Sequence, residues 1–262
     1  MFNIKNYNQY DEYEISVLEN LHYIITETIK LWFNHDSRDS KKVNFLHENL
    51  IVLLNNYINH NKYAIIQEWK VAWKFLDKDC DIVIVNKKYF STNDGSTIQD
   101  LQNKWKWWKT VIISWVEEVI SVKNPIASYK KNAANYMEAL IWEAVNLKEV
   151  WIRYSHFMFI SDTLPIYKNT FDDDGNSERE LIRKEEIWKK EIETFKKIKW
   201  LSIIDDFVTF FFNVKRYDDT FNFSSELIDE DPWITLYIED IPDIKYTFYF
   251  FEFLDEFYER YN

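Results

Sequence analysis

Three side chains able to do acid–base chemistry lie near the middle of the chain: Glu149, Arg153 and His156. Separations of four and three residues would place them on one side of a helix, where they could touch one another. A carboxylate that orients an imidazole beside a guanidinium could act as a general acid–base catalyst on a phosphodiester. A helix with a solvated stripe or a salt-bridge network gives the same pattern more often, so a nuclease-like enzyme is the alternative hypothesis here.

The scarcity of glycine excludes several other chemistries. The 262 residues contain only Gly95 and Gly175. Loops that cradle phosphate need several glycines close together, and no G-x-G-x-x-G, Walker or G-x-S-x-G motif can be written. Rossmann oxidoreductases, P-loop NTPases and α/β-hydrolases are therefore excluded, and few glycines also favour long helices over many tight turns.

Metal and cofactor motifs are absent as well. Cys80 is the sole cysteine, which excludes an intrachain disulfide and a multi-cysteine metal site. The five histidines are scattered, with no H-E-x-x-H or E-x-x-H spacing. We expect no metal site and no cofactor.

The negative charge is concentrated in residues 218–262. This segment holds 13 of the 44 acidic residues and only two basic ones, so it carries −11 of the net charge of −12. It also holds 13 aromatic residues, which a merely solvated acidic tail lacks. We therefore expect the segment to pack on a body formed by residues 1–217, with its carboxylates outward.

Such a surface suits a basic protein partner, because carboxylates steer the encounter and buried rings anchor the contact. The leading hypothesis is an inhibitor or immunity-type protein, of bacterial or phage origin, that neutralises an enzyme or toxin and could mimic nucleic-acid phosphate. The residues expected to bind the partner are Asp229, Glu230, Asp231, Trp233, Glu239 and Asp240. We expect a binding protein rather than an enzyme, and a structural subunit of a larger assembly is a further alternative.

We do not expect nucleic acid to be a partner of this chain, because an acidic protein repels phosphate unless a local basic patch overrides its electrostatic field. The stretch Lys104-Trp105-Lys106-Trp107-Trp108-Lys109 could stack nucleotides. On a helix, however, Trp108, Ile112 and Trp115 would form an apolar stripe, which favours packing in the core.

Apolar periodicity predicts a mainly α-helical, bundle-like single domain with a minor β element. Helices are expected over residues 12–34, 42–59, 62–76, 97–122, 126–160, 177–198 and 200–214. The β-branched stretch at 81–90 predicts a strand followed by a turn at Asn93–Gly95. Residues 233–239 alternate like a strand, and the apolar spacing from Phe250 to Tyr261 is helical.

The start of the chain has no signal-peptide pattern, and no apolar run is long enough to span a membrane, which predicts a cytoplasmic protein. The oligomeric state is left open, and no family resemblance is identified.

Overall fold

The computed structural model describes residues 10–34, 41–72, 77–102, 112–124, 129–161, 163–171, 177–186, 203–214, 234–237 and 250–262. The helices are α1 (Glu12–Asn34), α2 (Lys41–Asn55), α3 (Ile98–Gln102), α4 (Tyr129–Lys148) and α6 (Phe250–Tyr261). The strands are β1 (Tyr63–Ala72), β2 (Asp77–Asn86), β3 (Ser91–Thr92), β4 (Ile112–Ser114), β5 (Val116–Lys123), β6 (Arg153–Ser161), β7 (Thr163–Phe171), β8 (Ser177–Glu186), β9 (Asp206–Val214) and β10 (Ile234–Tyr237).

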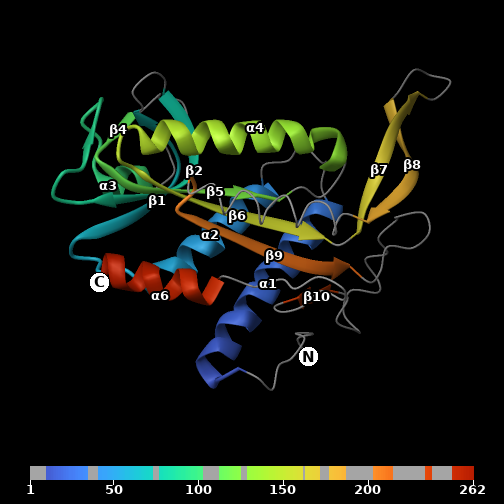
Figure 1. The fold of residues 1–262 in the computed structure, drawn as a ribbon, viewed down its shortest axis with the longest axis horizontal. Helices are drawn as coiled ribbons and strands as arrows, with labels where there is room; N and C mark the ends of the chain where they lie inside the picture. The colour runs from blue at the N-terminus through green and yellow to red at the C-terminus, as the bar shows by residue number, and fades with distance from the viewer. Residues whose placement is uncertain are drawn as a thin grey trace.

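Eight strands form one mixed sheet in the order β10-β9-β6-β5-β2-β1-β4-β3. At its centre β2 pairs antiparallel with β5, and β5, β6 and β9 run parallel to one another. Parallel neighbours need a crossover connection, and α4 supplies it between β5 and β6. Strands β7 and β8 form a separate antiparallel pair that projects at one end of the sheet (Figure 1).

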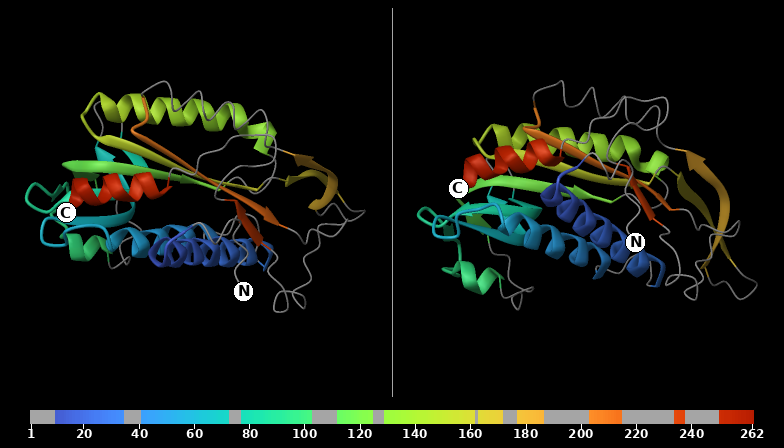
Figure 2. Two further views of the ribbon diagram at one scale, coloured as in Figure 1. Left: turned by 60° about the horizontal axis from the view of Figure 1, so that its bottom comes forward. Right: turned by 90° about the horizontal axis from the view of Figure 1, so that it is seen from below.

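Helices cover both faces of the large sheet. Helix α4 lies on one face, whereas α1, α2 and α6 lie on the other (Figures 1 and 2). On β6, Tyr154 contacts Glu143 of α4, and Phe157 packs on Phe253 of α6 with ring centroids 4.9 Å apart. Residues 154 and 157 differ in parity, so they point to opposite faces of the strand, as the two-residue repeat requires.

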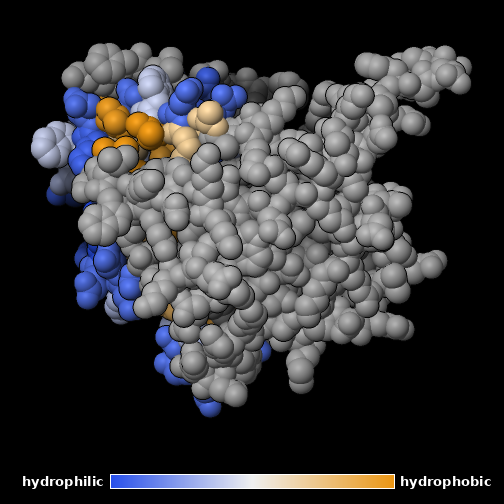
Figure 3. All heavy atoms as spheres, turned by 45° about the vertical axis from the view of Figure 1, so that its right-hand side comes forward, coloured by the Kyte–Doolittle hydropathy of each residue, from blue (hydrophilic) through white to orange (hydrophobic). Residues whose placement is uncertain are grey.

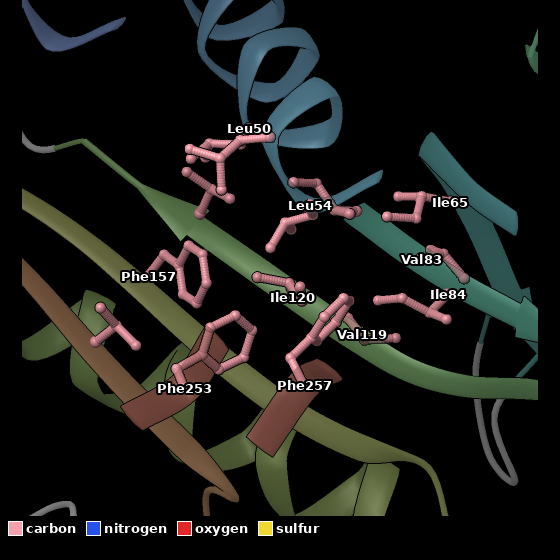
Figure 4. Close-up of a cluster of buried hydrophobic side chains, with 14 of the residues drawn as sticks. Leu50, Leu54, Ile65, Val83, Ile84, Val119, Ile120, Phe157, Phe253 and Phe257 are labelled. Carbon is pink, nitrogen blue, oxygen red and sulfur yellow. The ribbon is translucent and has the colours of Figure 1, made fainter. Parts of the chain in front are cut away.

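The core between the sheet and α2 and α6 is apolar and rich in aromatic rings (Figure 4). Leu50 and Leu54 of α2 and Phe253 and Phe257 of α6 meet Phe157 there, and all five side chains are buried. Edge-to-face ring packing adds to the burial of apolar area. This core holds α6 on the sheet.

The outer face of α4 is partly apolar. Ile141, Trp142 and Val145 expose 38%, 47% and 44% of their surface. In Figure 3 an apolar patch lies next to hydrophilic residues, at the height that α4 has in Figure 1. Among the described residues, no helix is both long and apolar enough to cross a membrane.

The predicted mainly α-helical bundle is wrong, since the chain has an α/β architecture. The expected helix at 62–76 is β1, and that at 97–122 is α3, β4 and β5. The expected long helix at 126–160 divides into α4 and β6, and those at 177–198 and 200–214 contain β8 and β9. Central strands are buried on both faces and read as continuous apolar runs, which resemble a buried helix when counted by spacing.

Other element predictions are confirmed. Helices α1, α2 and α6 and strand β10 form in the stretches where the sequence predicts them, and β2 overlaps the strand expected at 81–90 but begins four residues earlier. Gly95 takes a left-handed φ of 75° in the expected turn. The inference that few glycines favour long helices over a fold with sheet turns is wrong, since the described residues form an eight-stranded sheet. Positive φ occurs without glycine at Glu68 within β1, at Trp115 between β4 and β5, and at Trp151 in the turn after α4. The expectation of an all-α protein is overturned by the mixed sheet. The inhibitor or immunity-type hypothesis rested on the acidic segment 218–262, and the structure does not support it.

Candidate functional site

A polar pocket of about 190 Å³ lies between the sheet and α4. Its walls are Lys78, Asp79, Cys80, Asp81, Val119, Ser121, Lys123, Glu143 and Leu147. Two lysines, Lys78 and Lys123, and three carboxyl side chains, Asp79, Asp81 and Glu143, line it from β2, β5 and α4. Such a convergence of titratable groups in a cavity is typical of functional sites.

Asp81 is held by three donors from β5. Its Oδ2 accepts hydrogen bonds from Ser121 Oγ at 3.2 Å, from the backbone N–H of Val122 at 2.7 Å and from Lys123 Nζ at 3.1 Å. Antiparallel pairing of Ile82 with Ile120 sets the register that brings these groups together. Burial would raise the pKa of Asp81, but Lys123, His47 and the Val122 N–H outweigh it, and the pKa falls below its usual value. Asp81 is therefore ionised near neutral pH.

Glu143 projects from α4 into the same pocket. Its Oε1 lies 3.0 Å from Lys78 Nζ, and its Oε2 accepts a hydrogen bond of 3.0 Å from the hydroxyl of Tyr154. Burial acts to lower the pKa of Lys78, but the Glu143 carboxylate outweighs it, so the pKa is raised and the ammonium is retained. Burial and Glu143 raise the pKa of Tyr154, which keeps its hydroxyl proton.

His156 lies behind this pair and is 1% exposed. Its Nδ1 is 3.2 Å from the Tyr154 hydroxyl, and its ring stacks on Phe207 with centroids 5.4 Å apart. Burial, assisted by Lys123, lowers its pKa to about 3, so the imidazole is neutral. Its Nε2 has no hydrogen-bond partner.

The pocket offers few groups for metal binding or for thiol chemistry. Asp79, Asp81 and Glu143 are the carboxyl side chains that line the pocket. Among the described residues, no three His, Cys, Asp or Glu side chains are grouped so that they could hold a metal ion. Burial raises the pKa of Cys80 well above that of an ordinary thiol, so Cys80 is not an activated nucleophile.

Arg153 belongs to a second polar cluster on the opposite face of the sheet. Its guanidinium contacts Asp206 at 3.3 Å and Asp205 at 3.7 Å. Nearby, Arg260 of α6 contacts Asp206 at 3.2 Å, and Glu118, which is fully buried, at 3.6 Å. This cluster ties the end of α6 to β5, β6 and β9.

The structure therefore does not bring Glu149, Arg153 and His156 together as the helical spacing predicted. Glu149 lies in the turn after α4, and Arg153 and His156 lie on β6 with their side chains on opposite faces. The expected partner-binding residues Asp229, Glu230, Asp231, Trp233, Glu239 and Asp240 fall outside the described residues, as does the basic and aromatic stretch at 104–109. The boundary at residue 217 stays a prediction.

Sequence reasoning missed Asp81, Lys123, Glu143 and Tyr154. Asp81 and Lys123 are 42 residues apart and meet only through strand pairing. On β5 the alternation of Ser121 and Lys123 with Val122 is a signal that the sequence offers, because a two-residue repeat of polar groups marks one face of a strand. On β6, Arg153 and Ser155 are polar as well as Tyr154 and His156, so no such repeat is visible. The helical assignment of residues 97–122 hides the repeat on β5.

No family model matches the chain, and no curated protein matches it. A structure of Pseudomonas aeruginosa ATCC27853 NucC in its cAAA-bound form is similar at 12% identity, covering 72% of this chain and 91% of that one, with a TM-score of 0.37. Similarity at this level supports no conclusion about the chain.

Proposed function

We propose that the pocket beneath α4 binds and hydrolyses a phosphodiester, which makes the chain a nuclease-like enzyme. The observation that supports the proposal is the convergence of two lysines and three carboxyl side chains on one cavity. The side chains of Lys78, Lys123 and Asp81 remain 38%, 29% and 25% exposed, so an incoming group can reach them.

The two lysines suit an anionic substrate. A phosphodiester gains negative charge on its equatorial oxygens as it is attacked, and preorganised cations in a partly dehydrated pocket stabilise that charge. Lys123 on β5 and Lys78 on β2 would contact the phosphate from two strands. Glu143 and Asp81 hold the two ammonium groups in place before substrate binds.

Asp81 is the candidate to orient the attacking water, because it is ionised and lies in the pocket. Water oxygen bonds to phosphorus as the bond to the leaving oxygen breaks; the proton from water passes to Asp81, and the leaving oxygen takes a proton from Lys78 or solvent. The hydroxyl of Tyr154 contacts both His156 and Glu143, and Glu143 in turn contacts Lys78. Tyr154 and His156 would therefore position Lys78 through Glu143. His156 thus has an indirect role here, and Arg153 has none.

The test is cleavage of labelled single- and double-stranded DNA and RNA by the purified chain, with and without added Mg²⁺. Lys123→Met removes the charge and retains the stem, and we expect the rate to fall by about 100-fold or more. Lys123→Arg should retain part of the activity. Lys62→Ala, at an exposed lysine before β1, is the matched control. Absence of cleavage by the unaltered chain, or equal rates for it and Lys123→Met, would refute the proposal.

A further inference from the structure

Three aromatic side chains are exposed at one end of the sheet, away from the apolar core. Trp151 exposes 94% of its surface, Trp115 67% and Tyr89 48%. Single exposed apolar residues are ordinary, but a group of large rings at one place marks an interaction surface.

Strand pairing brings the three positions together. Trp115 directly precedes β5 and Trp151 lies two residues before β6, and the parallel pairing of Glu118 with Arg153 sets the starts of these strands side by side (Figure 1). The antiparallel pairing of Val85 with Val116 brings the end of β2, followed by Tyr89, to the same end. The rings of Tyr89 and Trp115 have centroids 6.0 Å apart.

The two tryptophans share an unusual backbone conformation. Trp115 has a φ of 64° and Trp151 a φ of 63°, in the left-handed region that bulky residues rarely adopt. Trp151 follows the last turn of α4, where the N–H of Ile152 bonds to the carbonyl oxygen of Leu147 at 3.0 Å, so its φ belongs to the cap of that helix. Trp115 lies between β4 and β5, and its ring contacts Tyr89. Both indole rings stay exposed in these backbone positions.

Positive charge accompanies the rings. Lys88 Nζ lies 4.9 Å from the centroid of the Tyr89 ring, and Lys87 and Lys88 are both exposed. Rings beside lysines are the combination that binds single-stranded nucleic acid, since bases stack on the rings and ammonium groups contact the phosphates. A local basic group of this kind can act against the negative net charge of the chain.

We infer that Tyr89, Trp115 and Trp151, with Lys88, form a stacking surface for the bases of single-stranded nucleic acid. The choice of nucleic acid as ligand rests on the proposed function. The surface lies at the start of β5 and the pocket includes Lys123 at its end, so the surface would bind one part of the strand while another part is cut in the pocket. Stacking is tolerant of base identity, so the surface would select single strands over duplexes rather than one sequence over another.

The test measures binding of a fluorescent single-stranded oligonucleotide of about 16 nucleotides, within the range that such proteins cover. All binding is measured in the Lys123→Met background, so that the probe stays intact. We expect Trp115→Ala and Trp151→Ala each to weaken binding by about five-fold or more, and Trp151→Tyr to retain most of it. Tyr258→Ala, at an aromatic residue 53% exposed on α6, is the matched control and should bind as the parent does.

Two further measurements separate this inference from the proposed function. An abasic probe of equal length should bind weakly and equally to all variants, because it has phosphates but no bases. Ring-dependent binding without cleavage by the unaltered chain would retain the stacking surface and reject the nuclease. Cleavage with binding that is unaffected by either tryptophan variant would reject the surface, as would absence of oligonucleotide binding, and the rings would then fit a protein partner.

Discussion

Tyr154 and His156 lie two residues apart on β6 and are joined by a 3.2 Å contact between Oη and Nδ1. The Tyr154 hydroxyl has one proton, which it donates to the Glu143 carboxylate. The Nδ1 of His156 must then donate to Tyr154, which fixes the tautomer and leaves Nε2 as an unprotonated acceptor. The hydrogen bonds thus run in one direction, from His156 to Tyr154 and from Tyr154 to Glu143 in the pocket.

Tyr154→Phe should destabilise the protein by about 1–3 kcal/mol, because it leaves His156 Nδ1 and Glu143 Oε2 buried without their shared partner. Urea unfolding monitored by circular dichroism measures the change in the free energy of unfolding. Tyr258→Phe removes an exposed hydroxyl and serves as the control. Equal stability of Tyr154→Phe and the parent would show that the hydroxyl chain is not formed.

Acid should destabilise the protein through His156. Its pKa is about 3 in the folded chain and near 6.5 when unfolded, so the unfolded state binds more protons between these values. Stability is therefore unaffected by this group above about pH 6.5 and falls as pH drops toward about 3, by up to about 1.4 kcal/mol per pH unit. The groups facing His156 are Tyr154, Asp81 and Lys123.

The measurement is urea unfolding between about pH 7 and pH 5 for the parent and for His156→Gln, which has no titrating ring. The difference in the free energy of unfolding between the two should become smaller as the pH falls, because only the parent loses the stability that depends on a neutral His156. A constant difference would mean that His156 titrates normally in the folded chain.

The sequence predicted the elements at the ends of the chain better than the central ones. In α1 and α6 one face meets the core and the other meets water, so the apolar spacing of three and four residues is visible. The stretch from Arg153 to Ser161 lies under α4 on one face and under α6 on the other. A strand with both faces buried loses its two-residue alternation, and its type then depends on contacts far away in the sequence.

The candidate site shows the same limit. His156 was singled out for its chemistry, but its neighbours were taken from a helical register, which pairs it with Glu149 and Arg153. In a strand the register pairs it with Tyr154 on its own side and places Arg153 on the other. The contact of Asp81 with Lys123 depends on the order of strands in the sheet, which local spacing does not encode.

Arg260→Met should destabilise the protein by about 3–5 kcal/mol, because the fully buried carboxyl group of Glu118 would lose its cationic partner on α6. Burial raises the pKa of Glu118, and Arg260 and the hydroxyls of Ser155 and Tyr261 oppose that shift. In the double variant Glu118→Gln/Arg260→Met the two changes should be less costly together than their sum. Thermal and urea unfolding of all three variants measure this coupling, and strict additivity would contradict it.

The last prediction concerns α6, which packs on the sheet through aromatic rings. Phe253 is 2% exposed and lies 4.9 Å from Phe157 and 5.3 Å from Phe257, measured between ring centroids. Phe253→Ala removes most of this buried ring from the core and should reduce stability by about 3–5 kcal/mol. Tyr258→Ala, on the exposed side of the same helix, should change stability by less than about 0.5 kcal/mol. Urea unfolding of both variants gives the comparison, and nearly equal stabilities would mean that α6 does not share the core that Phe157 and Phe253 define.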